Sequence, residues 1–175
     1  RQERALELLR CATDNNQGSA ALRLLWQELA GSARPPVVAE SYDVFLSYSH
    51  ADTLFARRLL GDLEAAGLTV WTDEGLAAGT HNWQAAIERA VEQAQCVVVV
   101  MTPRAKASKW VRAEASLAEE LDKPVFPVLA AGERREAVLL SLRDVQFVDV
   151  RADYSPVVTN LIPSICRTLG IAPST

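Results

Sequence analysis

From residue 42 onward, short apolar runs alternate with longer stretches in which apolar residues recur every three or four positions. Short apolar runs predict strands, and the three-to-four-residue spacing predicts helices. We predict strands at residues 42–47, 68–72, 96–101, 124–130 and 145–150, helices at 53–67, 83–94, 110–122 and 155–170, and a helix or helical turn at 133–143. Strands that alternate with helices indicate an α/β fold with one parallel sheet, right-handed crossovers and helices on both faces.

The predicted strands differ in pattern, and the differences indicate their places in the sheet. Residues 96–101 read CVVVVM and are apolar on both faces, which is typical of a central strand with helices on each side. Cys96 is then a small core residue. The strand at 124–130 contains Pro124 and Pro127, which places it off centre. The alternation of apolar and polar residues in 145–150 fits a sheet edge.

The first 41 residues follow a separate pattern. Residues 1–31 have helical spacing that is interrupted by the turn-forming stretch DNNQGS, and two prolines follow at 35 and 36. We predict a helical segment at 1–34, a linker at 35–41, the main domain at 42–170 and a tail at 171–175. The helical segment is interpreted as the end of a neighbouring domain of a longer parent protein, or as an addition that packs against the main domain.

Composition excludes several classes of function. The net charge of −4 argues against general nucleic-acid binding, which usually shows as a basic excess. The central apolar run CVVVVM is far shorter than the roughly 20 residues of a membrane span. Three widely separated cysteines and two distant histidines argue against a disulfide framework or a metal site. We expect a cytoplasmic protein with no nucleic-acid or membrane partner and no metal.

Polar residues gather where the first two strands end. The first strand runs into Ser47, Tyr48, Ser49 and His50, and open parallel sheets bind ligands at the carboxyl ends of their strands. The alternative is that Ser49 or Asp52 only caps the next helix. The loop at 73–82 is ten residues long, which exceeds the usual two to six and suggests either a functional loop or a surface excursion.

The helix predicted at 110–122 begins at the same edge. Trp110 and Glu114 are four residues apart and share one helix face, and Ser108 is a candidate N-cap. A carboxylate near a helix amino terminus is stabilised in its charged form. Glu114 is therefore either a site residue or an ordinary first-turn acid, and Trp110 is either a site wall or a core residue.

Three stretches together resemble the Toll/interleukin-receptor (TIR) domain in the form common in bacterial proteins. They are YDVFLSYSHAD at 42–52, GLTVWTDEGLAAGTHNWQAAIERAVEQAQCVVVVMTP at 67–103 and SKWVRAEASLAEELDKPVFPVL at 108–129. The resemblance runs from about residue 42 to 149, with the last helix to about 170. It implies a flavodoxin-like five-stranded parallel sheet.

The resemblance also implies a choice of activities. Many members cleave NAD+ at the nicotinamide–ribose bond, and they carry a Glu four residues after a Trp, as Glu114 follows Trp110 here. Others only assemble signalling complexes through TIR–TIR contacts. For an enzyme, it implies Glu114 as the catalytic residue and NAD+ as substrate rather than cofactor. The implied substrate-binding residues are Ser47, Ser49, His50, Asp73, Leu76, Gly79, Trp83 and Trp110. Some enzymatic members have basic residues where this chain has Ser49 and His50.

Two hypotheses follow from these residues. The first is an NAD+ glycohydrolase in bacterial defence, activated by self-association that orders the loop at 73–83 and giving linear or cyclic ADP-ribose. The second is a non-catalytic scaffold that signals through the same loop. Glu114 with Trp110 favours the first. A flavin- or nucleotide-binding module is disfavoured because no Gly-x-Gly-x-x-Gly motif follows the first strand.

Overall fold

A computed structural model of the chain describes residues 41–73 and 83–172. The helical segment expected at 1–34, most of the linker and the loop residues 74–82 lie outside the described residues, so their predictions stay untested.

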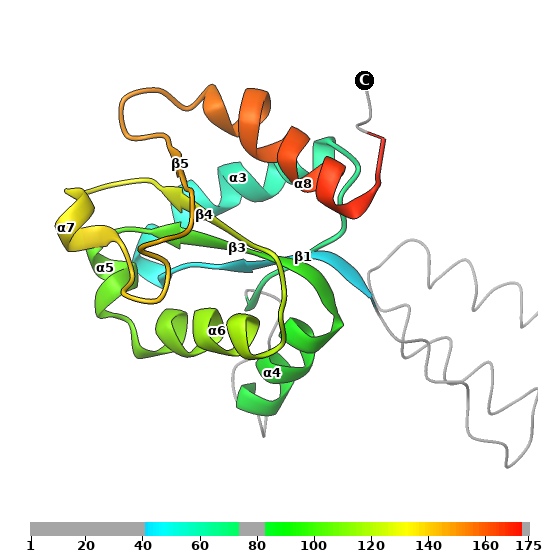
Figure 1. Ribbon diagram of the computed structural model, residues 1–175, viewed down its shortest axis with the longest axis horizontal. Coiled ribbons are helices and arrows are strands. Elements are labelled where there is room, and N and C mark those ends of the chain that lie inside the picture. The colour runs from blue at the N-terminus through cyan, green and yellow to red at the C-terminus, as the bar shows by residue number, and fades with distance from the viewer. Residues whose placement is uncertain (1–40, 74–82, 173–175) are drawn as a thin grey trace, which may run out of the picture. The chain divides into compact units, whose positions relative to one another are not determined.

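The described residues form a five-stranded parallel sheet, as the alternating pattern predicts (Figure 1). Its strands are β1 (Tyr42–Ser47), β2 (Val70–Trp71), β3 (Ala94–Met101), β4 (Val125–Leu129) and β5 (Val148–Asp149), in the order β2-β1-β3-β4-β5. This is the flavodoxin-like strand order. The apolar strand β3 is central, the proline-containing β4 is off centre, and β5 is at an edge, as predicted from their compositions.

Helices cover both faces of the sheet (Figure 1). Helices α3 (Thr53–Ala65) and α8 (Ile162–Leu169) lie on one face, and α4 (Trp83–Gln93) and α6 (Lys109–Glu120) lie on the other. Alternate residues of β3 enter the two cores: Val98 packs with the α3 and α8 side chains, and Val99 with those of α4 and α6. This explains why the β3 residues 96–101 are apolar at every position. Cys96 is fully buried, as predicted, and burial raises the pKa of its thiol to about 12.

Several elements are shorter than predicted. The strands predicted at 68–72 and 145–150 keep two paired residues each, in β2 and β5, which are the two edge strands of the sheet. The helix or turn predicted at 133–143 is a single turn, α7 (Arg134–Ala137). The last helix begins as a π-helical segment, η3 (Val157–Leu161), and α8 has Pro163 in its first turn, where a proline is tolerated.

A further helix, α5 (Pro103–Ala107), lies between the strand predicted at 96–101 and the helix predicted at 110–122, where we predicted no regular structure. Thr102 Oγ1 accepts a hydrogen bond of 2.9 Å from the Ala105 N–H and so caps this helix. A threonine followed by proline at the first helical position is a helix-start signal that our sequence analysis overlooked.

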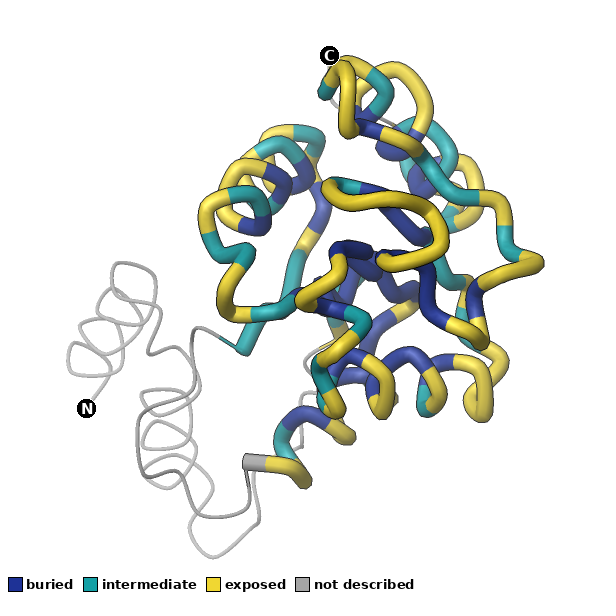
Figure 2. Tube along the Cα trace, turned by 90° about the vertical axis from the view of Figure 1, so that its left-hand side faces the viewer, coloured by how far each residue is buried: buried dark blue, intermediate teal, exposed yellow. Residues whose placement is uncertain are grey.

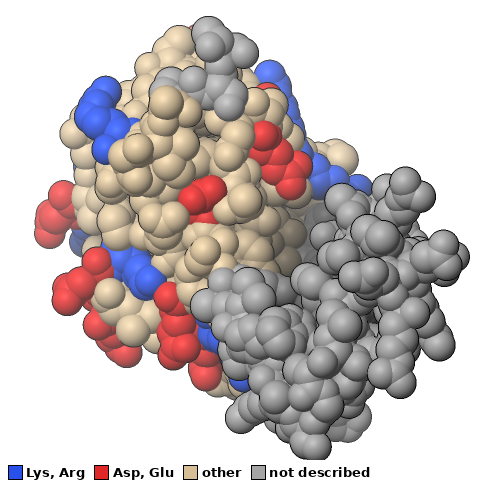
Figure 3. Space-filling view, turned by 90° about the vertical axis from the view of Figure 1, so that its right-hand side faces the viewer, with Lys and Arg blue, Asp and Glu red and all other residues tan. Residues whose placement is uncertain are grey.

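Polar residues at the amino edge of the sheet have a structural role. Asp43 Oδ2 accepts hydrogen bonds from the Thr69 backbone N–H at 2.8 Å and from Thr69 Oγ1 at 2.7 Å, and Oδ1 accepts one from Gln95 Nε2 at 2.9 Å. These bonds join the starts of the three neighbouring strands β1, β2 and β3. Figure 3, which faces this edge, shows an acidic side chain in the middle of a mostly uncharged area, with acidic and basic side chains around it.

A pair of glycine substitutions tests how the segment after β4 packs. Gly132 has φ +80°, and a Cβ there would lie 2.5 Å from Cγ of Pro103, whereas a Cβ at Gly61 in α3 would meet nothing within 4 Å. We expect Gly132→Ala to lower the free energy of unfolding by roughly 2–4 kcal/mol, from backbone strain and overpacking. Gly61→Ala should raise it by roughly 0.5–1 kcal/mol through helix propensity. Urea denaturation measures both, and similar effects of the two variants would contradict the close packing of Gly132 on Pro103.

Candidate functional site

The predicted polar run at residues 47–50 lies at the end of β1, on the carboxyl edge of the sheet, which Figure 2 faces. Ser47 is the last residue of β1, is 1% exposed and lies opposite Val99 of β3. The chain then enters the short helix η1 (His50–Asp52), which leaves Ser49 half-buried and His50 exposed.

The capping alternative for Ser49 and Asp52 is wrong, because neither side chain makes a cap hydrogen bond to the helix that follows it. The Asp52 carboxylate instead accepts a 2.6 Å hydrogen bond from Thr102 Oγ1 and lies 3.7 Å from Arg104 Nη1. Arg104 Nη1 also donates to the Ala51 carbonyl oxygen at 3.0 Å. Sequence reasoning missed this link, which ties the segment after β1 to the start of α5 after β3.

Helix α6 places Glu114 against the tip of β1. The helix begins as predicted, with Ser108 Oγ accepting a hydrogen bond from the Val111 N–H. Glu114 is 9% exposed, and its Oε2 accepts a 2.6 Å hydrogen bond from Ser47 Oγ. The pair is separated by 67 residues in the chain. Glu114 is therefore not a solvent-exposed first-turn acid: it faces the strand tips.

The electrostatic environment of Glu114 is unusual for a carboxyl group. Burial raises its pKa from the ordinary value of 4.5 to about 7. The hydrogen bond from Ser47 opposes this rise, the nearby Asp73 carboxylate adds to it, and His50 lowers the pKa slightly. Near neutral pH the group is thus divided between protonated and ionised forms. Strongly shifted carboxyl groups of this kind are common in functional sites, although structural networks also produce them.

Asp73 and His50 form a second pair beside Glu114. Asp73 lies just after β2, and its Oδ2 is hydrogen-bonded to Nε2 of His50. The other carboxylate oxygen, Oδ1, is buried and has no hydrogen-bond partner among the described residues. The His50 side chain is 77% exposed and that of Asp73 23%. The structure therefore brings together four predicted site residues, Ser47, His50, Asp73 and Glu114.

The remaining predicted site residues are only partly described. Trp110 lies one helical turn before Glu114, is half-buried and has the Lys109 ammonium 4.9 Å from its ring centroid. Trp83 is the first residue of α4, but its side chain, like Leu76 and Gly79, lies outside the described residues. Their predicted roles stay predictions.

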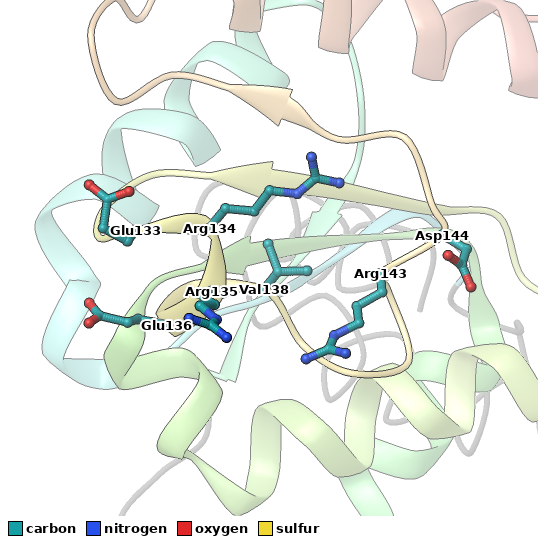
Figure 4. A pocket seen from close by; sticks show the side chains of 7 residues that line it. All are labelled: Glu133, Arg134, Arg135, Glu136, Val138, Arg143 and Asp144. Carbon is teal, nitrogen blue, oxygen red and sulfur yellow. The ribbon is translucent and has the colours of Figure 1, made fainter.

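A separate hollow of about 870 Å³ lies beside α7 and the turn that follows it. It is lined by Glu133, Arg134, Arg135, Glu136, Val138, Arg143 and Asp144. Figure 4 shows the acidic side chains at its two ends and the arginines between them. No residue predicted as part of the site lines this hollow. We therefore locate the candidate site at Glu114 and the residues around it, and not at this hollow.

No group of three or more His, Cys, Asp or Glu side chains in residues 41–73 and 83–172 is arranged to hold a metal ion. Within the same ranges, no helix is both long and apolar enough to cross a membrane.

Comparisons with known proteins identify the fold. A family model described as "TIR domain" matches residues 44–161. The TIR domain of a Toll-related receptor from Hydra magnipapillata is 20% identical, with a TM-score of 0.62, covering 71% of this chain and 98% of that one. A TIR-STING receptor from C. gigas, solved with 2',3'-cGAMP, is 23% identical, with a TM-score of 0.61. The match covers 73% of this chain and 40% of that one.

The TIR domains of the activated Roq1 resistosome, which recognises the pathogen effector XopQ, are 20% identical to this chain. The TM-score is 0.55, and the match covers 74% of this chain and 99% of that one. At these identities the solved structures establish the fold alone. A search of curated protein sequences gave no significant match.

Proposed function

The chain belongs to the TIR domain family, and from that premise we propose that it is an NAD+ glycohydrolase that cleaves the nicotinamide–ribose bond and is activated by self-association. The observation that carries the proposal is the position of the Glu114 carboxyl group, at the tip of β1 and beside Asp73 and His50. Parallel α/β sheets of this strand order bind their ligands at that edge.

The chemistry requires one carboxylate. As nicotinamide leaves, positive charge develops on the ribose ring, and an ionised Glu114 close to that ring stabilises the oxocarbenium-like transition state. The low exposure of Glu114 strengthens this interaction, because fewer water molecules screen the charge. Nicotinamide departs from a cationic pyridinium as a neutral molecule, so no second acid needs to protonate it. Water or the adenine ring then accepts the ribosyl group.

Other residues of the site fit supporting roles. The half-buried Trp110 provides an apolar wall for a ring of the substrate. Asp73 and His50 stand where the segments after β1 and β2 meet, and Asp73 begins the predicted contact loop at 73–83. Two of the similar structures are described as receptors and one as an activated resistosome, which supports a role in signalling or defence.

A non-catalytic scaffold is the second candidate. Burial of Glu114 with a hydrogen bond from Ser47 is also what a satisfied structural polar pair looks like. In that case the TIR domain signals only through contacts with other TIR domains.

The two candidates are distinguished by NAD+ turnover as a function of protein density. We expect nicotinamide release per molecule to rise steeply when the protein is held on nickel-bearing vesicles through a terminal tag, compared with the same amount in dilute solution. Chromatography of the reaction measures nicotinamide and identifies linear or cyclic ADP-ribose. If no nicotinamide appears at any density, while the tethered protein self-associates, the scaffold is the correct interpretation.

A further inference from the structure

Ser47 is a buried residue at the end of a paired strand. It ends β1, which pairs with β2 on one side and with the central strand β3 on the other, and it lies opposite Val99. Ser47 is 1% exposed, so little of its side chain is accessible to solvent or to a ligand. A serine hydroxyl has one proton to donate, and that proton is directed at Glu114 Oε2 over 2.6 Å.

The packing of helix α6 fixes the backbone of Glu114. Its helix begins at the Ser108 cap, and Val111 and Ala115 of the same helix are buried in the core under the sheet. The backbone of Glu114 is therefore fixed, while its carboxyl group can still rotate about the last side-chain bond, whose torsional preference is broad. The bond from Ser47 removes that freedom and leaves Oε1 as the oxygen that Ser47 does not engage.

We propose that Ser47 is a positioning residue, which fixes the Glu114 carboxyl group so that Oε1 faces the ribose of the substrate, and that Ser47 does not itself contact the substrate. This inference rests on the proposed NAD+ glycohydrolase function. It changes the role that the family resemblance implies for Ser47, from binding the substrate to orienting the group that acts on it.

The groups around Glu114 make this role measurable. The described charged groups that influence Glu114 are Asp73, which raises its pKa, and His50, which lowers it. Helices α4 and α5 also pack against α6, but they turn apolar residues such as Val91 and Ala105 toward this core. Ser47 is thus the main group that opposes the effect of burial, and its loss should raise the pKa of Glu114 further.

Ser47→Ala and Ser47→Thr are the test variants, because alanine removes the hydroxyl and threonine retains it. The first measurement is a pH titration of the Glu114 side-chain carbon by NMR, with the resonance assigned from Glu114→Gln. We expect the pKa to rise by about one unit in Ser47→Ala, since the carboxylate loses a hydrogen bond that stabilises its charged form. Ser47→Thr should titrate like the wild type.

The second measurement is NAD+ cleavage by the tethered protein across pH. In Ser47→Ala, kcat near pH 7 should fall about fivefold, because a pKa one unit higher lowers the ionised fraction of Glu114 from about a half to about a tenth. The rising limb of the pH profile should move to higher pH by the same amount as the NMR titration, and KM should change little. Ser47→Thr should restore kcat and the profile.

Each result has one meaning. An unchanged Glu114 titration in a folded Ser47→Ala variant overturns the proposal, and so does a raised KM with kcat unchanged, which would mean direct contact with the substrate. A raised pKa in Ser47→Ala, together with no NAD+ cleavage by any variant, retains the positioning of Glu114 and rejects the proposed enzymatic function. If Ser47→Ala does not fold, Ser47→Cys replaces it, because a thiol of similar size donates only weakly and should give an intermediate titration shift.

Discussion

Replacing Glu114 with glutamine should reduce nicotinamide release by roughly 10²–10³-fold, the usual effect of removing one group that stabilises transition-state charge. Glutamine has nearly the same shape and its carbonyl oxygen can still accept the hydrogen bond from Ser47 Oγ. It cannot carry the negative charge that stabilises the developing positive charge on the ribose. Nicotinamide release by the tethered protein, measured by chromatography above neutral pH, tests this expectation.

The chain provides a matched control on the same helix. Glu119 also belongs to α6 but is exposed, so Glu119→Gln makes the same chemical change away from the strand tips and should leave turnover within about twofold of the wild type. Equal turnover by the wild type and Glu114→Gln would remove Glu114 from the reaction. Equal loss in both variants would mean that charge on α6, and not the site, governs activity.

Much of the fold could be predicted from the sequence because its signals are local. The apolar run in β3 requires burial on both faces, and only the centre of a helix-covered sheet provides that. The prolines of the fourth strand and the alternation in the fifth likewise indicated their positions. The lengths of β2 and β5 could not be predicted, because they depend on pairing register. Phe45 and Trp71 show this: their rings stack at 4.9 Å only once β1 and β2 are aligned.

The candidate site could be predicted in part, for a topological reason. Carboxyl ends of parallel strands meet at one edge, so Ser47, Asp73 and the helix that carries Glu114 had to lie near one another. The sequence could not give the pairing within that group. The link between His50 and Asp73, and that between Ser47 and Glu114, depend on side-chain positions that no spacing rule specifies. The burial of Glu114 is also a tertiary property, since the same position on an uncovered helix would be solvated.

The same burial predicts that Glu114→Gln stabilises the protein above neutral pH. Folding shifts the pKa of Glu114 from the ordinary 4.5 to about 7, so the folded state binds more protons than the unfolded state between these values. Stability from this group is complete below the lower value and is lost as pH rises to the upper one. The loss is on the order of 3 kcal/mol, at about 1.4 kcal/mol per pKa unit. Urea denaturation at about pH 8 should therefore show Glu114→Gln to be more stable than the wild type by roughly 2–3 kcal/mol.

The pH dependence separates this effect from a general improvement in packing. Near pH 5 the carboxyl group in the folded wild type is protonated and as neutral as glutamine, so the stability difference should largely disappear there. Glu119→Gln makes the same substitution at an exposed position of α6 and serves as the control at both pH values. A difference that is the same at both pH values would contradict a buried, partly protonated Glu114. If Glu114→Gln gains stability and loses NAD+ cleavage, the fold retains an unfavourably buried carboxylate for its chemistry, as functional sites often do.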